Sequence, residues 1–584
     1  MEDKSHGSAI APNGSSVRRE AGLMTHLDCD VLIVGAGGAG MYAAIAAARA
    51  GAGHVLLADK SLVGRGGATV MAQMTVAAAL GHECPDDWTA HLEDTLAAGR
   101  GLCEESLAAC LCHEAPARIL EMAEWRVGWA RRADGRIAQV SAPGHSRPRC
   151  CYVDFLNTGP AVAATLRRQI GHVAAIRRLS NLNVTDIVTA DGEAAGEVVG
   201  AVALDSATGE AVTIAAKAVI IAAGGLTRIF RRNSASANMG GDGYALALAA
   251  GADLVDMEFV QFFPIGHLAP RLVGMDPIMW DPFRYKLGGR LLDGSGREFL
   301  ADYGSDETSG YTTPRDLATY AIEKEVAAGR GSPHGGVYLS FTHVPKSALD
   351  AAFGPVIARL AKNGIDLGQM PVEVAPIAHY HMGGIAVDER MASRVPGLFA
   401  AGEAAGGANG ANRLSGNAIP EALVFGERAG RSAAAYAATR TLRWERRCAA
   451  PALERIGTLA EGRRGDLSAA VLLDELRELM GTEVGAFRTA AGLARAIARL
   501  AEMRAGLSTA AIAPGLLFNP TVADWFELRA SLIAAEAVAH AALAREESRG
   551  AHQREDFPET DPGWARSQYV RMTRDGTLAV GGAR

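Results

Sequence analysis

The sequence predicts an α/β protein in which a Rossmann-like dinucleotide-binding domain is interrupted by an α+β insertion and followed by a helical domain. Three observations support this fold class. A buried strand, a glycine-rich turn, a helix and a second strand follow one another over residues 30–59. Fully apolar strands return at residues 218–221 and 397–402, on either side of an irregular stretch. Residues 436–548 then show helical periodicity.

The first strand–helix–strand unit is the clearest part of this pattern. Its first strand is the apolar run 31–34, and its second strand, residues 55–57, ends at Asp59. An alanine-rich helix joins the two strands, as in a unit of a parallel sheet. Residues 86–127 also have helical periodicity, and residues 184–204 alternate like a β-hairpin.

These patterns predict the domain boundaries. The expected parts are a flexible N-terminal tail (1–25), a first segment of the nucleotide-binding domain (26–255), an inserted capping domain (256–370), a second segment (371–435), a C-terminal helical domain (436–548) and a C-terminal tail (549–584). The last of these contains proline, arginine and aspartate and is expected to wrap the surface.

Length and composition limit the possible functions. A chain of 584 residues is too long for one hydrophobic core, so two or three domains are expected. The net charge of -7 gives no broad cationic field, so nucleic acid is not an expected partner. No stretch reaches the ~18 apolar residues of a membrane span, and the first 24 residues lack the apolar run of a secretory signal. We therefore expect a soluble, cytoplasmic protein.

The eight cysteines are spread along the chain. No two of them have the two-residue gap that metal and redox sites usually need, so neither a metal site nor an iron–sulfur cluster is expected. Reduced thiols that pack in the interior are the simplest interpretation. If the protein passes electrons onward through such a cluster, a separate partner has to carry it.

A dinucleotide fingerprint lies between the first strand and the helix. Its glycines permit a tight turn, close approach of the backbone to a pyrophosphate, and close packing of helix on strand, while helix N–H groups face the phosphates. Asp59 ends the second strand, where a carboxylate binds a ribose hydroxyl. The fingerprint alone does not distinguish NAD from FAD. Its residues are Gly35, Ala36, Gly37, Gly38, Ala39 and Gly40.

Three later motifs favour FAD. They are Ala222-Ala223-Gly224-Gly225 followed by Gly241-Asp242-Gly243; His379-Tyr380-His381-Met382-Gly383-Gly384; and Gly402-Glu403 followed by Gly410-Ala411-Asn412-Arg413-Leu414 and Asn417-Ala418-Ile419. In this order and spacing the chain resembles the flavoprotein subunits of succinate dehydrogenase and fumarate reductase. The resemblance runs from about Cys29 to about Gly430 and returns at residues 547–552. It implies an FAD-binding domain interrupted by a capping domain.

The resemblance also implies which residues hold FAD. Beside the fingerprint they are Asp59, Lys60, Ala68, Thr69, Gln73, Asp242, Glu403, Asn417, Ala418 and Ile419. Membrane-bound members of the family attach FAD covalently through a histidine shortly after the second strand, and Ala68 stands at that place. We therefore expect a non-covalent flavin, which mildly favours reduction of the substrate over its oxidation.

Basic residues match the catalytic apparatus of the family. Reduction of an activated alkene needs hydride from flavin N5, a proton donor on the opposite face, and cations that hold a carboxylate. By resemblance, Arg315 within Thr313-Pro314-Arg315-Asp316 is the proton donor. His379 and Arg413 match the pair that grips a substrate carboxylate, Arg413 in bidentate fashion. His381 is a weaker candidate for the same pocket.

The chain departs from the family where fumarate-reducing members bind the second carboxylate. Phe263 replaces their histidine. Residues 281–289 lack both the threonine–glutamate pair and the glutamate–arginine relay, which leaves Arg284 or Lys286 as substitutes. We expect one aromatic side of the pocket, with Asp281 placed to meet a cation. The aromatic residues are Phe262, Phe263, Trp280 and Phe283. The predicted substrate is an enoate, or its saturated product, whose second substituent is neutral, aromatic or cationic.

Several alternatives remain open at this point. The sequence also resembles L-aspartate oxidase in its fingerprint and C-terminal segment, but that enzyme should keep a dicarboxylate pocket, which Phe263 argues against. The flavoprotein of adenylylsulfate reductase is a further relative, loosely similar over residues 280–289. A hypothesis from a different functional class is that the protein is a non-catalytic, regulatory flavoprotein that has lost its proton relay. Relatives often pass electrons to a separate iron–sulfur subunit, which is a possible partner here beside the small carboxylate substrate.

Overall fold

A computed structural model describes most of the chain. Residues 1–8, 11–15, 21–23, 155, 193–195, 273–277, 305–314 and 583–584 are not described. The predicted N-terminal tail therefore lies largely outside the described residues. Two short strands within it are described, β1 (Ala9–Ile10) and β2 (Ser16–Glu20), and β2 pairs antiparallel with the start of β3 (Met24–Val34).

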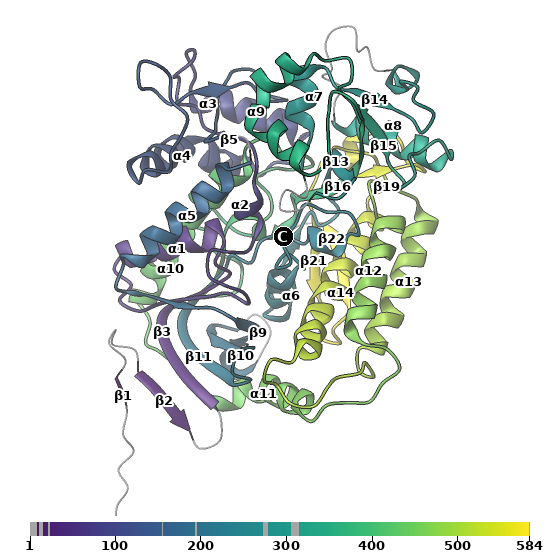
Figure 1. Ribbon diagram of the computed structural model, residues 1–584. Coiled ribbons are helices and arrows are strands. Elements are labelled where there is room, and N and C mark those ends of the chain that lie inside the picture. The colour runs from purple at the N-terminus through teal and green to yellow at the C-terminus, as the bar shows by residue number, and fades with distance from the viewer. Residues whose placement is uncertain are drawn as a thin grey trace, which may run out of the picture.

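Five parallel strands form the centre of the nucleotide-binding domain, and the long strands β3 and β11 among them lie side by side at the lower left of Figure 1. In spatial order they are β8 (Ile176–Leu179), β4 (Val55–Ala58), β3, β11 (Ala211–Ile221) and β18 (Leu398–Ala400). The predicted hairpin, β9 (Leu182–Thr189) and β10 (Val198–Asp205), extends the sheet beside β11. Because β18 follows the insertion and returns to this sheet, the interrupted Rossmann-like architecture is confirmed.

Strand β3 is longer than the apolar run that predicts it. It begins at Met24, well before Val31, and pairs with β11 along its whole length. Its first half contains polar residues such as Thr25 and His26, so it carries no apolar signal. Pairing with the equally long β11 satisfies the backbone groups there instead.

Alanine-rich helices allow close packing around the sheet. Helix α1 (Gly38–Arg49) connects β3 to β4 and packs against α10 (Ala418–Ala438). Both helices bury alanines, such as Ala43 and Ala433, which let the two backbones approach. The remaining elements of this domain are α2 (Ala68–Met71), α3 (Trp88–Ala98), α4 (Glu105–Glu124), α5 (Thr158–Gly171), α6 (Asp242–Ala249), β5 (Val76–Ala77), β6 (Gln139–Val140) and β7 (Cys150–Cys151).

The insertion folds as a separate α+β cap, at the top of Figure 1. Its antiparallel sheet has the order β13 (Val260–Ala269), β16 (Val372–His381), β15 (Val337–Ser340) and β14 (Arg290–Leu292). Three helices accompany it: α7 (Asp281–Leu287), α8 (Arg315–Ala327) and α9 (Lys346–Lys362). The sheet continues past residue 370, the predicted end of the cap, because β16 pairs with both β13 and β15.

Four helices make up most of the C-terminal domain, beside the cap and the sheet (Figure 1). They are α11 (Arg446–Ala460), α12 (Ala469–Glu483), α13 (Ala490–Gly506) and α14 (Pro520–Ala544). Short pairings link the end of the chain to the other domains. These involve β12 (Leu254–Val255), β17 (Gly384–Ile385), β19 (Phe487–Arg488), β20 (Gln553–Arg554), β21 (Gln568–Met572) and β22 (Leu578–Gly582).

The predicted C-terminal tail is exposed over residues 555–563, but its start and the end of the helical domain before it contain buried charged residues. Arg545 is fully buried, where its Nε donates to Glu258 Oε1 at 2.5 Å and its Nη1 to Glu547 Oε1 at 3.0 Å. His552 is also fully buried, with Nδ1 2.8 Å from Arg488 Nη1. A polar sequence predicts exposure, but paired charges and hydrogen bonds make burial possible.

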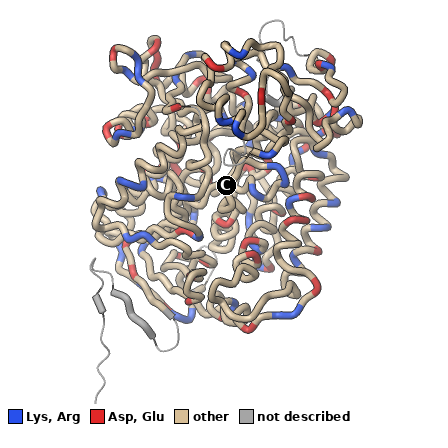
Figure 2. Tube along the Cα trace, viewed as in Figure 1, with Lys and Arg blue, Asp and Glu red and all other residues tan. Residues whose placement is uncertain are grey.

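Basic and acidic residues are interspersed along the described chain in the view of Figure 2. In the part of the chain that the structure describes, no helix combines the length and apolarity needed to cross a bilayer.

Candidate active site

The glycine fingerprint forms the turn between β3 and α1, at the carboxyl end of the parallel sheet. Gly35 has a φ of +101°, and a Cβ there would lie 2.4 Å from the carbonyl oxygen of Ala222, just after β11. A Cβ on Gly40 would lie 1.8 Å from the carbonyl oxygen of Gly35. Only glycine fits at these positions, so turn, strand and helix are in direct backbone contact.

Two side chains hold this turn in place. Asp59, directly after β4, accepts a 2.8 Å hydrogen bond from the Ala36 N–H through Oδ2. Thr69 Oγ1, on α2, accepts from the Gly38 N–H at 3.1 Å. The N-cap residue of helix α1 is Gly37, which has no side chain to accept hydrogen bonds from the first N–H groups of the helix. The positive end of the helix dipole therefore lies at a turn that is suited to a phosphate.

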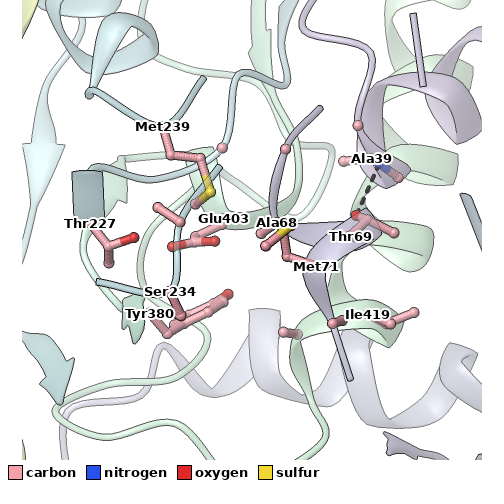
Figure 3. A pocket seen from close by; sticks show the side chains of 18 of the residues that line it. Ala39, Ala68, Thr69, Met71, Thr227, Ser234, Met239, Tyr380, Glu403 and Ile419 are labelled. Atoms are coloured by element: carbon pink, nitrogen blue, oxygen red, sulfur yellow. Dashed lines mark hydrogen bonds between the residues drawn. The ribbon is translucent and has the colours of Figure 1, made fainter. Parts of the chain in front are cut away.

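One cavity extends from this turn to strand β16 and the start of α10. Figure 3 shows Ala39 and Thr69 on one side of it and Tyr380 and Glu403 on the other. The fold thus brings together residues from both segments of the nucleotide-binding domain and from the cap. The predicted residues that line the cavity are Gly35, Ala36, Gly37, Gly38, Ala39, Asp59, Ala68, Thr69, Gln73, Phe263, His379, Glu403, Arg413, Ala418 and Ile419.

Four predicted cofactor residues are not among the described residues that line this cavity. Lys60 Nζ pairs with Asp242 Oδ2 at 2.9 Å, so these two charges neutralise each other. The buried amide of Asn417 bonds to His91 Nε2 at 2.9 Å and to Thr95 Oγ1 at 3.1 Å, which ties the start of α10 to α3. The four residues are Gly40, Lys60, Asp242 and Asn417.

Asp281 and His381, both predicted for the substrate pocket, are also absent from the described lining of the cavity. Asp281 is buried at the start of α7 in the cap. His381 has Nε2 3.0 Å from the carbonyl oxygen of Met257 and Nδ1 3.0 Å from the Tyr244 hydroxyl. Burial lowers the pKa of His381 to about 4, so it is neutral at physiological pH. The side chain of Arg315 lies outside the described residues.

His379 and Arg413 reach the cavity from different segments of the chain. His379 Nδ1 lies 2.8 Å from Ser234 Oγ. Arg413 is 5% exposed, and its Nη2 donates to Gln261 Oε1 at 3.2 Å. A desolvated guanidinium and an imidazole in one cavity suit a carboxylate, because charge-assisted hydrogen bonds are stronger than neutral ones. The structure therefore brings the predicted pair together.

Phe263 provides an aromatic wall beside His379. The two ring centroids are 5.6 Å apart, with an interplanar angle of 60°. Alanines, Ile419 and four methionines also line the cavity, and the methionines are Met71, Met74, Met239 and Met279. The lining of the cavity next to His379 and Arg413 is therefore largely apolar.

The predicted aromatic side is wrong in its extent. Trp280 and Phe283 contact each other inside the core of the cap, with centroids 5.0 Å apart. Phe262 alternates with Phe263 along β13 and so points elsewhere. Arg284 is buried in the cap, and Lys286 Nζ lies over the Phe353 ring. None of these residues is among the described lining of the cavity.

Glu403 places a carboxyl group at the cavity. Its Oε1 accepts a hydrogen bond from the His381 N–H at 3.1 Å. Desolvation raises the pKa of Glu403 to about 8, with a further contribution from the nearby Glu421 carboxylate. At neutral pH this side chain is therefore mostly protonated and acts as a hydrogen-bond donor.

The shifted pKa predicts a pH dependence of stability in the flavin-free protein. Because the folded-state pKa of Glu403 lies above the ordinary 4.5, its stabilising contribution is complete below that pH and is lost as pH rises through about 8. Glu403→Gln cannot ionise, so we expect its thermal unfolding temperature to exceed that of the wild type at about pH 9 but not at about pH 5. Parallel pH profiles for the two proteins would contradict this assignment.

Some lining residues had no signal in the sequence. Ser234, Asn238 and Met239 come from the irregular segment between β11 and α6, which has no periodicity to read. The glycine motifs at residues 222–225 and 241–243 lie on either side of that segment, and they alone indicated that it could lie near the cofactor. Tyr380 also lines the cavity, although only the two histidines of its motif were predicted to be site residues.

These features fit FAD. A Cβ on Gly37 would meet no protein atom within 4 Å, so open space lies over the fingerprint turn where a pyrophosphate belongs. Methionines, His379 and Arg413 line the same cavity. The turn, Asp59, Thr69 and Ile419 would hold the cofactor along this length.

Comparisons with known proteins agree with the site. A family model for an FAD binding domain matches residues 30–419, and one for the fumarate reductase flavoprotein C-terminal region matches residues 473–580. The chain is 36% identical over 548 residues to one of the subunits of the CoM/CoB fumarate reductase of Methanothermobacter marburgensis, covering 92% of this chain and 96% of that protein. It is 34% identical over 539 residues to L-aspartate oxidase of Caulobacter vibrioides, covering 91% and 94%.

The architecture is similar to that of solved fumarate reductases. Quinol fumarate reductase of Escherichia coli superposes with a TM-score of 0.87 at 33% identity, over 96% of this chain and 97% of that chain. Both the cofactor turn and the cap therefore have counterparts in a known enzyme. The chain belongs to the fumarate reductase and succinate dehydrogenase flavoprotein family, and it is an FAD-dependent oxidoreductase that acts on CH–CH groups.

Proposed function

We propose that this flavoenzyme interconverts a monocarboxylic enoate and its saturated form, with a non-covalent FAD. The observation that carries the proposal is the single cavity in which His379 and Arg413 lie beside Phe263. His379 and Arg413 bind one carboxylate, and the apolar ring of Phe263 lies next to it. Ala68 supports the non-covalent cofactor, because an alanine side chain has no atom able to bond to the flavin.

Each residue at the site has a separate task. Arg413 and His379 hold the carboxylate and stabilise the negative charge that develops while hydride adds to the β-carbon. Bound FAD supplies the hydride-transfer chemistry. Arg315, at the start of α8, or a water molecule that it positions, delivers the proton to the α-carbon. Arg315 must then be reprotonated quickly, because a guanidinium does not stay deprotonated in a protein.

Phe263 sets the substrate class. A second carboxylate against its ring would lose its hydration without gaining a paired charge, which costs several kcal/mol. A neutral or aromatic second substituent fits the Phe263 wall and the methionines beside it. A cationic substituent has less support, because Asp281 is not among the described residues that line the cavity.

Substrate preference tests this proposal directly. In anaerobic stopped-flow experiments with photoreduced enzyme, cinnamate or crotonate should reoxidise the flavin at least about tenfold faster than fumarate, since about 1.4 kcal/mol already gives a factor of ten. Phe263→His should raise the rate with fumarate by about tenfold, because it restores a donor for the second carboxylate.

Phe557→His is the control, since that partly exposed ring is not among the described residues that line this cavity or the second cavity beside Arg413. A wild-type enzyme that prefers fumarate to every monocarboxylic enoate would refute the substrate class. Peroxide formation with L-aspartate would favour the oxidase alternative.

A separate iron–sulfur subunit is the electron partner that we propose. The Methanothermobacter relative is named as one subunit of a fumarate reductase. The eight cysteines of this chain are free thiols and lack the spacing of a cluster site. A partner that carries the cluster would accept or supply the electrons of the flavin.

A further inference from the structure

Arg413 is stacked on a tyrosine ring. Its guanidinium carbon lies 4.3 Å from the centroid of Tyr380, the residue that follows His379 on β16. Gln261 contacts Arg413 twice, through Oε1, which accepts from Nη2 at 3.2 Å, and through Nε2, which donates to the Arg413 carbonyl at 3.0 Å. An aromatic face and one amide thus contribute to setting the orientation of the guanidinium.

A buried carboxyl group holds Tyr380 in turn. The tyrosine hydroxyl donates to Glu421 Oε2 at 2.6 Å, and Asn409 Nδ2 donates to the same oxygen at 2.8 Å. Glu421 is 1% exposed on α10, two residues after Ile419, which lines the flavin cavity. The first turn of α10 therefore supports the cofactor directly and Arg413 through one tyrosine.

Packing alone does not require the Tyr380 hydroxyl. The ring already lies in an apolar cluster with Leu102, Phe259 and Met382, which a phenylalanine would fill equally well. A buried hydroxyl and a buried carboxyl group each cost desolvation free energy. Their presence is explained if the bond between them fixes the tilt of the ring that Arg413 rests on.

We infer that Tyr380 and Glu421 are positioning residues that hold Arg413 in the orientation that binds the substrate carboxylate. The inference rests on the proposed role of Arg413. Glu421 acts through Tyr380, since it is not among the described residues that line the cavity. Loss of the hydroxyl bond should therefore weaken carboxylate binding and slow hydride transfer at saturation less than removal of Arg413 does, while FAD binding changes little.

The chain offers a matched control with the same chemistry elsewhere. Near the other end of α10, the Tyr436 hydroxyl donates to Glu197 Oε1 at 2.7 Å, and the Arg440 guanidinium carbon lies 4.8 Å from the Tyr436 ring centroid. Tyr436 is not among the described residues of the flavin cavity. Tyr436→Phe thus removes an equivalent hydrogen bond without touching the site.

The test measures the affinity of the oxidised holoenzyme for crotonate and for fumarate, followed by the change in flavin absorbance. Oxidised flavin has no hydride to give an enoate, so these complexes do not react. We expect Tyr380→Phe and Glu421→Ala each to raise the dissociation constant about tenfold, and Tyr436→Phe to leave it unchanged. Glu421→Gln keeps an oxygen that accepts the bond, so it should stay within about threefold of the wild type. The double variant Y380F/E421A should be no weaker than either single variant, because both changes break one unit.

Wild-type affinity in Tyr380→Phe, additive losses in the double variant, or a Glu421→Gln as weak as Glu421→Ala would overturn the inference. Loss of FAD or of thermal stability in Tyr380→Phe would also overturn it, because the bond would then serve packing. Arg413→Met distinguishes failure of the positioning role from failure of the proposed function. If it binds carboxylates as the wild type does, or if neither probe perturbs the wild-type flavin, the proposed function fails as well. If it alone loses binding, only the positioning role fails.

Discussion

Arg413→Met is expected to slow the reoxidation of reduced flavin by an enoate about a thousandfold, comparable to the loss of one oxyanion-stabilising donor. Arg413 is almost fully buried, so no water replaces its hydrogen bonds to the carboxylate. Its positive charge also offsets the negative charge that builds up during hydride addition. The change therefore acts on the transition state as well as on substrate binding. Stopped-flow traces at several enoate concentrations would separate the two effects.

Arg440→Met provides the comparison for this variant. Arg440 is likewise stacked on a tyrosine, but its side chain is half-exposed and distant from the described cavity lining. It should reoxidise at the wild-type rate. A loss of less than about tenfold in Arg413→Met would contradict the assignment of this arginine as the main carboxylate ligand.

Gly37→Val is expected to yield a folded protein that binds FAD at least about a hundredfold more weakly, because the side chain would occupy the space of the pyrophosphate. Gly37 has φ -73° and ψ -164°, which valine adopts without strain. Apart from its chain neighbours, the new Cβ would meet no protein atom within 4 Å, so we expect the fold to be retained. Flavin released by acid precipitation measures the cofactor content, and complete release would also support the non-covalent attachment.

Gly457→Val, on α11, is the steric control. A Cβ at Gly457 also meets no protein atom within 4 Å, and the residue lies outside the described cavity lining. This variant should retain FAD as the wild type does. Normal flavin content in Gly37→Val, or failure of that protein to fold without cofactor, would argue against the placement of the pyrophosphate over the turn.

The cofactor end of the site was predictable because its signal is local. The fingerprint needs glycines at set positions between a strand and a helix, and the structure has them there, with Gly35 at positive φ. Asp59 was predicted from its place at the end of the second strand and Thr69 only through the family resemblance, and both line the cavity. The sequence did not show that Lys60 and Asp242 lie outside the cavity lining, because an ion pair between residues far apart in the chain cannot be recognised from sequence.

The substrate end was predictable only through family motifs. His379 and Arg413 meet at one cavity as expected, yet His381, two residues from His379, is held by Tyr244 and a backbone carbonyl. Identical residue types in one motif therefore have different environments, which spacing does not reveal. Tyr380 was overlooked for the same reason, since its value lies in a contact with Arg413.

The sequence by itself determined the fold class and the dinucleotide fingerprint, because these depend on periodicity and on backbone conformations that only certain residues allow. FAD and the family followed from the resemblance of its later motifs to those of known flavoproteins. Tertiary structure alone decided which side chains share the cavity, that Tyr380 lies against Arg413, and that charged residues near the C-terminus such as Arg545 and Arg554 are buried. Those outcomes depend on contacts between residues that are far apart in the chain. Burial and pairing at such distances follow from the packing of the domains, and no local pattern encodes them.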